Sequence, residues 1–139
     1  MAYGVITTLV NLTNSYDVQE ITDEMLELAK FAKHHIPEAH ELDDEDFVDK
    51  RIFALAELGV TTALVALAKT ESKNLRELIG RVLNAICKHR DLRGLVVQQG
   101  GSKVLVQLAL DGTDKGKRTA ARALSRIGIT QVINNNNIL

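Results

Sequence analysis

Apolar residues in the second half of the chain recur at the spacing of amphipathic helices. In residues 103–110 they fall at positions i, i+1, i+4 and i+5, and residues 115–128 carry a second such stripe. The two stripes consist of Val104, Leu105, Leu108 and Ala109, and of Ala120, Ala121, Leu124, Ile127 and Gly128. This pattern predicts two helices separated by a polar turn.

The same order of residues occurs 41 residues earlier in the chain. Aligning Gly100 with Gly59 places Leu105 on Leu64. The alignment extends over two helix lengths with no insertion or deletion. Self-similarity at a fixed period of about 40 residues is typical of helical repeat proteins. Each repeat is therefore expected to contain a short helix, a glycine corner, a second helix, a polar turn and a longer third helix.

Local signals mark the expected helix ends. Glycine tolerates the left-handed backbone of a tight corner, so the two aligned glycines are expected to adopt it. Thr113 or Asp114 is expected to cap the last helix with a side-chain oxygen. In the earlier copy, Asn74 followed three residues later by Glu77 resembles a capping box.

The first half of the chain is less regular. Residues 2–13 resemble the third helix of a truncated repeat. An extra helix is expected at 22–35, and Pro37 should end it because proline cannot continue a helix. An acidic loop follows, and then a helix from about 44 to 58.

These elements predict one all-α domain at residues 1–130, with full repeats at 44–89 and 91–129. Residues 131–139 include four consecutive asparagines, so we expect a disordered tail or a remnant of cloning. Helical arrays normally end in polar capping repeats. The two and a half repeats of this chain lack them, so we expect a fragment of a longer solenoid. Eight aliphatic residues should form its continuous core: Leu64, Leu67, Leu83, Ile86, Leu105, Leu108, Leu124 and Ile127.

Composition supports a soluble protein without catalytic machinery. Apolar residues make up 45% of the 139 residues and no run is long enough to span a membrane, so we expect a cytosolic protein. His35 and His40 lie near acidic residues, but their spacing fits no zinc or calcium signature. The single cysteine, Cys87, is expected to be a small buried apolar residue. We expect no enzyme, cofactor or metal.

Charge is unevenly distributed, and this suggests a candidate binding surface. Residues 1–50 contain twelve acidic and three basic residues, whereas residues 51–139 contain six acidic and fourteen basic ones. Lys115, Arg118, Arg122 and Arg126 step by three or four residues and therefore share one helical face, and Arg81 aligns with Arg122. A solvated face without a ligand is the alternative. The scarcity of aromatic residues, 4%, argues against nucleic acid.

Helical repeats of this length and order resemble armadillo repeats. Their third helices carry the pattern Ala-Leu-x-Asn-Leu, which is similar to TLVNL at 8–12, VLNAI at 82–86 and ALSRI at 123–127. The resemblance implies a right-handed helical solenoid of about two and a half to three repeats. It also implies that the third helices line a concave groove, where a basic stripe would favour an acidic or extended peptide.

The wording of three longer segments is more specific. The segments YGVITTLVNLTNSYD, MLELAKFAKHHIPE and QGGSKVLVQLALDGTDKGKRTAARALSRI together resemble the central region of the animal UCS-type myosin chaperones. The resemblance implies a cytoplasmic myosin-folding co-chaperone, in which a separate domain binds a heat-shock chaperone and another holds the myosin motor domain. This region would then be a non-catalytic scaffold that orients the flanking domains, with client contact or self-association as a further role.

A peptide-binding module of the importin or catenin type is the alternative. Such modules pair an asparagine at the fourth position of Ala-Leu-x-Asn-Leu with the ligand backbone. That position holds Asn11 in the first copy, but Ala85 and Arg126 in the other two. The residues predicted to bind protein in the groove are therefore Asn11, Arg81, Lys115, Arg118, Arg122 and Arg126, with charge and shape more important than backbone pairing.

Overall fold

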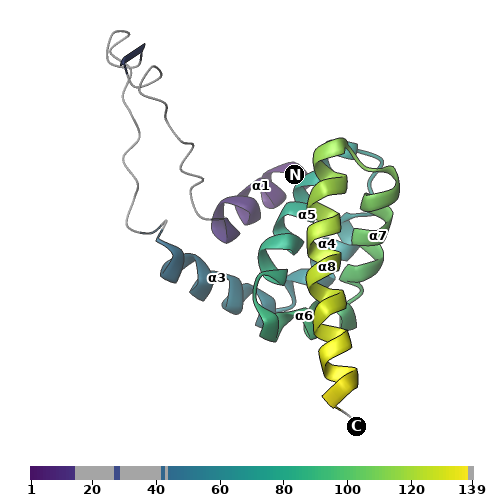
Figure 1. The fold of residues 1–139 in the computed structure, drawn as a ribbon. Coiled ribbons are helices and arrows are strands. Elements are labelled where there is room, and N and C mark those ends of the chain that lie inside the picture. The colour runs from purple at the N-terminus through teal and green to yellow at the C-terminus, as the bar shows by residue number, and fades with distance from the viewer. Residues whose placement is uncertain (15–26, 29–41, 43, 138–139) are drawn as a thin grey trace.

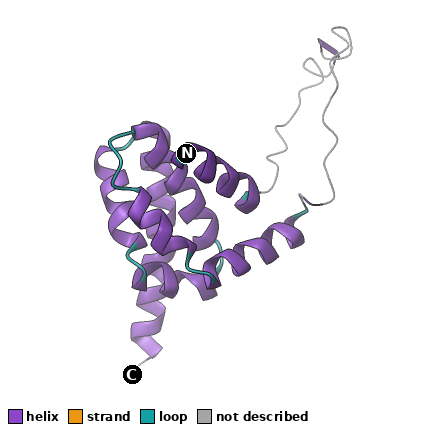
Figure 2. Ribbon diagram, turned by 180° about the vertical axis from the view of Figure 1, so that it is seen from behind, coloured by secondary structure: helices purple, strands orange, loops and turns teal. Residues whose placement is uncertain are grey.

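The fold was analysed in a computed structural model that describes residues 1–14, 27–28, 42 and 44–137, with side chains to residue 130. All regular structure in these ranges is helical, which confirms the all-α prediction there (Figure 2). The helices are α1 (Ala2–Thr13), α3 (Glu45–Glu57), α4 (Val60–Leu67), α5 (Lys73–Cys87), α6 (Arg90–Gln98), α7 (Gly101–Asp111) and α8 (Asp114–Asn137).

The helices α3–α5 and α6–α8 each form a group of three in which the third helix is the longest. Gly59 joins α3 to α4 and Gly100 joins α6 to α7, with φ angles of 86° and 88°. Both glycines therefore adopt the predicted left-handed conformation, which a side chain would disfavour. The predicted helices at 44–58, 103–110 and 115–128 correspond to α3, α7 and α8.

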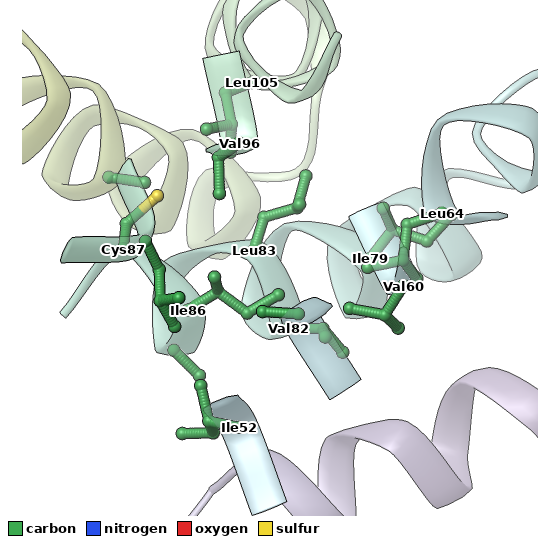
Figure 3. Packing of buried hydrophobic residues seen from close by; sticks show 14 of the residues in the cluster. Ile52, Val60, Leu64, Ile79, Val82, Leu83, Ile86, Cys87, Val96 and Leu105 are labelled. Atoms are coloured by element: carbon green, nitrogen blue, oxygen red, sulfur yellow. The ribbon is translucent and has the colours of Figure 1, made fainter. Parts of the chain in front are cut away.

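The helices α1, α5 and α8 stack in sequence. The helix α5 packs against α1 on one side and against α8 on the other (Figure 1). A single cluster of buried hydrophobic residues connects these helices with α3, α4, α6 and α7 (Figure 3). All eight predicted core residues belong to it, with Leu67 and Leu124 only partly buried. Aliphatic side chains on every helix thus contribute to one continuous core.

Of the two helix caps predicted from the sequence, one is confirmed and the other is wrong. Thr113 caps α8 as predicted, because its Oγ1 accepts a hydrogen bond from the Gly116 amide at 3.0 Å. The capping box at Asn74 is wrong: the N-cap of α5 is Ser72, whose side chain accepts from the Leu75 amide. Glu77 instead accepts a hydrogen bond from the Thr113 hydroxyl at 2.8 Å. Tertiary contact, rather than local capping, accounts for this glutamate.

The predicted tail can be compared with the structure, whereas most of the predicted extra helix cannot. The helix α8 continues to Asn137, where we expected a disordered tail from residue 131 onward. The extra helix at 22–35 and Pro37 lie outside the described residues, apart from 27–28, which are helical. None of the described helices is both long enough and apolar enough to cross a bilayer.

Candidate protein-binding surface

The basic residues predicted on α8 do lie at its surface, but they differ in environment. Lys115, Arg118 and Arg122 are exposed, whereas Arg126 is half-buried. The Arg126 guanidinium donates a hydrogen bond through Nη1 to Asn84 Oδ1 on α5 at 3.1 Å. Arg126 therefore joins two helices, and Lys115, Arg118 and Arg122 are the side chains that present unburied positive charge.

The two remaining predicted residues lie on different helices. Asn11 is exposed on α1, and Arg81 is half-buried on α5. Ala85, which aligns with Asn11 and Arg126, is only 1% exposed. The three aligned positions thus offer an amide, a covered methyl group and an arginine that already has a partner. They do not form a repeated ladder for a peptide backbone.

The contacts between α5 and the following helices divide the basic stripe further. Arg76 on α5 lies 3.9 Å from Asp111, and Glu77 accepts a hydrogen bond from Thr113. Glu77 occupies the position that Arg118 occupies 41 residues later. Arg118 therefore belongs to the face that stacks helices in the earlier copy.

Sequence reasoning missed this stacking face because helical spacing alone does not tell which neighbour a face meets. The usable signal is the alignment of the two copies. Positions that are polar in one copy and contact the next helices there mark a seam rather than a free surface. The seam residues Arg76, Glu77 and Asn84 are all polar and half-buried.

A second polar cluster lies at the corner between α5 and α6. The His89 Nε2 atom lies 3.2 Å from Asp49 Oδ1 on α3, and its ring meets Phe53 edge-on with centroids 5.0 Å apart. No group of three potential metal ligands occurs among the described residues, and His34, His35 and His40 lie outside them. His89 links neighbouring helices.

Cys87 is fully buried at the end of α5. Burial raises the pKa of its thiol from 9.0 to about 11, and the nearby charges of Arg93 and Arg126 lower it in part. A thiol is a poor nucleophile when it stays protonated. The prediction of a buried apolar residue is confirmed.

Comparison with curated proteins identifies relatives of this arrangement. No protein-family model matches the chain. Over 129 residues the chain is 50% identical to protein unc-45 homolog B of Homo sapiens and 49% identical to that of Mus musculus. Each alignment covers 90% of the chain but only 14% of the relative. The chain thus spans about one seventh of the length of these relatives.

Two solved structures share the fold. UNC-45 from Drosophila melanogaster matches with a TM-score of 0.73 and 66% identity, over 93% of this chain and 16% of that one. An UNC-45 chaperone that binds and folds muscle myosin matches with a TM-score of 0.62 and 33% identity, over 89% of this chain and 14% of that one. The similarity to a chaperone agrees with the prediction of a non-catalytic chain.

Proposed function

We propose that this chain, which is homologous to a segment of the UNC-45 myosin chaperones, is a non-catalytic helical scaffold of a cytoplasmic myosin-folding co-chaperone. In this proposal it forms part of a right-handed armadillo-type solenoid and holds the flanking parts of a longer chaperone in a defined orientation. The observation that carries the proposal is the stack of α1, α5 and α8 around one continuous core. In such a stack each of these helices is packed on its neighbour, so that one group of helices fixes the position of the next.

Two arginine side chains support the role of a spacer, because each donates a hydrogen bond from the first helix of a group to the end of a preceding helix. Arg51 on α3 donates through Nε to the Leu12 carbonyl at the end of α1, at 3.0 Å. Arg93 on α6 donates through Nε to the Cys87 carbonyl at the end of α5, at 2.6 Å. Both contacts satisfy a terminal carbonyl that the helix itself leaves unpaired, and a positive charge is favourable there. The joint between successive helix groups is therefore built the same way twice.

Direct client contact is the second part of the proposal. Lys115 and Arg122 are exposed on α8. Two unburied cations two turns apart on a helix favour an acidic segment of the myosin motor domain. The importin-type alternative is not favoured by the structure, because Ala85 is buried where an asparagine would have to reach a peptide backbone.

The test is binding of the chain to a myosin motor fragment at low and moderate salt. Lys115→Glu with Arg122→Glu is expected to weaken binding at least tenfold, about 1.4 kcal/mol, and to reduce its salt dependence. Arg126 is left intact because it bonds to Asn84, and its replacement would disturb packing.

A matched charge reversal controls for net charge. Arg90→Glu with Lys103→Glu changes two exposed residues on α6 and α7, helices that do not contribute to the stripe, and should leave binding unchanged. Equal loss in both double mutants would show an effect of net charge alone. No binding by the folded wild-type chain would reject client contact and leave the scaffold role to be tested by itself.

A further inference from the structure

The joint between α1 and α3 and the joint between α5 and α6 differ in the length of chain that crosses them. At the second joint, Arg93 donates to the Cys87 carbonyl across six residues of sequence. At the first, Arg51 donates to the Leu12 carbonyl across 39 residues. A short connection keeps the ends of two helices together by itself, whereas a longer one lowers the effective concentration at which they meet. The joint between α1 and α3 therefore depends more on direct contacts between its helices.

The Arg51 side chain binds both ends of the longer connection. Its Nε donates to the carbonyl of Leu12, in the last turn of α1, at 3.0 Å. Its Nη1 donates to the carbonyl of Leu42, shortly before α3 begins, at 2.7 Å. One guanidinium thus holds the point where the chain leaves α1 and the point where it returns to α3. The planar arrangement of its donors allows both bonds at once, in a geometry that a lysine ammonium would not fix.

The helix α1 has few buried residues to hold it on the stack. It buries Ile6, Val10 and Thr13, whereas α5 buries eight residues. The helices α4, α6 and α7 also bury only two or three residues each, but short turns join each of them to both of its neighbours. Elements with few buried apolar contacts are the ones that open locally while the rest of a protein stays folded. The contacts of α1 and the length of its connection together make it the candidate for such an opening.

We propose that Arg51 is the clamp of a detachable joint, which holds α1 on the stack by binding the Leu12 and Leu42 carbonyls. When both bonds are lost, α1 leaves as a unit while α3–α8 remain folded. This release uncovers Ile6, Val10 and the face of α5 on which α1 packs. The joint between α5 and α6 lacks this freedom, because only six residues separate Cys87 from Arg93. The stack thus contains one joint that opens and one that stays closed.

Native-state hydrogen exchange of the intact chain tests whether α1 opens separately. Arg51→Met removes both bonds but keeps most of the aliphatic stem, so the amides of residues 6–13 should exchange about tenfold faster. Arg93→Met should speed exchange in α5 and leave residues 6–13 unchanged, since the bond of Arg93 stays intact when α1 leaves. Lys50→Met, an exposed change beside Arg51, should leave exchange in both helices unchanged. Equal acceleration of α1 and α5 by Arg93→Met would overturn the proposal, because α1 would then open only with the whole stack.

A shortened connection tests the part played by its length. Replacing residues 16–40 by about ten glycine and serine residues keeps Leu12 and Leu42 and leaves enough chain to join them. Because a shorter connection raises the effective concentration of its ends, exchange of residues 6–13 should slow about threefold. Unchanged or faster exchange there would overturn the role of the connection, and unchanged exchange in Arg51→Met would overturn the clamp. No myosin is present in either experiment, so the results are independent of whether the chain binds a client.

Discussion

Arg93 shows how one side chain links three helices. Its Nε donates to the Cys87 carbonyl at the end of α5, and its Nη1 donates to Thr130 Oγ1 on α8 at 2.9 Å. Thr130 in turn donates to the Arg126 carbonyl at 3.1 Å. The guanidinium thus satisfies a terminal carbonyl of one helix while holding the side of another. Its planar, multi-donor geometry is what lysine could not reproduce.

Removing this guanidinium should destabilise the stack. Arg93→Met keeps most of the aliphatic stem and leaves the Cys87 carbonyl without its donor, so we expect a loss of about 1–3 kcal/mol. Urea unfolding followed by circular dichroism measures it. Arg90→Met, an exposed change on the same helix, should fall within about 0.5 kcal/mol of wild type. Similar losses in both variants would argue against a special role for Arg93.

The buried thiol predicts a specific pH dependence. Since the pKa of Cys87 is raised from 9.0 to about 11, its contribution to stability is complete below pH 9. Above pH 9 the unfolded chain releases the thiol proton first, so stability falls until about pH 11, by on the order of 2 kcal/mol. Urea unfolding between pH 8 and 10.5 should show a steeper decline for wild type than for Cys87→Ala. Parallel profiles would contradict the shift.

At the scale of elements, the ends of the helices depend on single residues with defined geometry. Ser72 begins α5 with a side-chain hydrogen bond, and Gly100 begins α7 with a left-handed backbone. The turn before α8 has two roles, since Thr113 caps α8 and also donates a hydrogen bond to Glu77 on α5. Element boundaries and element packing are therefore coupled at this turn.

The corner glycines should not tolerate a side chain. Gly100→Ala requires alanine at a φ of 88° and is expected to cost about 1–2 kcal/mol. Gly94→Ala is the matched control: it lies within α6, and a Cβ there meets nothing within 4 Å. It should stabilise the chain by up to about 1 kcal/mol because alanine favours helices. Calorimetric melting of the two variants should shift in opposite directions; shifts in the same direction would refute this account.

The cap of α5 can be assigned in the same way. Ser72→Ala removes the acceptor of the Leu75 amide and should cost about 1 kcal/mol. Asn74→Ala lies past the cap and should be neutral or slightly stabilising. Chemical denaturation measures the two losses of stability. A capping box at Asn74 would make Asn74→Ala the more destabilising of the two changes.

At the scale of the whole molecule, α5 is the central element, because α1 and α8 pack on either side of it and α3, α6 and α7 also contact it. Its residues Ile79, Leu83 and Ile86 are fully buried. The joined core predicts that disturbing α5 affects every helix at once.

Ile79→Ala is therefore expected to lower the stability of the whole stack by about 2–5 kcal/mol. Hydrogen exchange should report slowest exchange in α5 of the wild-type chain, and faster exchange in both α1 and α8 of the variant. Ala63→Gly, an exposed change on α4, provides a control for general weakening, at about 1 kcal/mol. Faster exchange confined to α5 would show that the helices do not share one core.

The sequence by itself determined the helices, their glycine corners and the aliphatic core. Each of these depends on local periodicity or on a backbone preference of one residue, as at Gly59 and Leu64. It also indicated the relationship to the myosin chaperones, which the comparisons confirm.

Only the tertiary structure decided which side of a helix is covered. Arg118 looks like a free surface cation along the chain, but its counterpart Glu77 is a stacking position. Arg126 looked equally free, yet it bonds to Asn84 from 42 residues away. Glu77 looked like a cap and instead joins two helix groups. These contacts depend on the approach of segments distant in sequence, which helical periodicity does not encode.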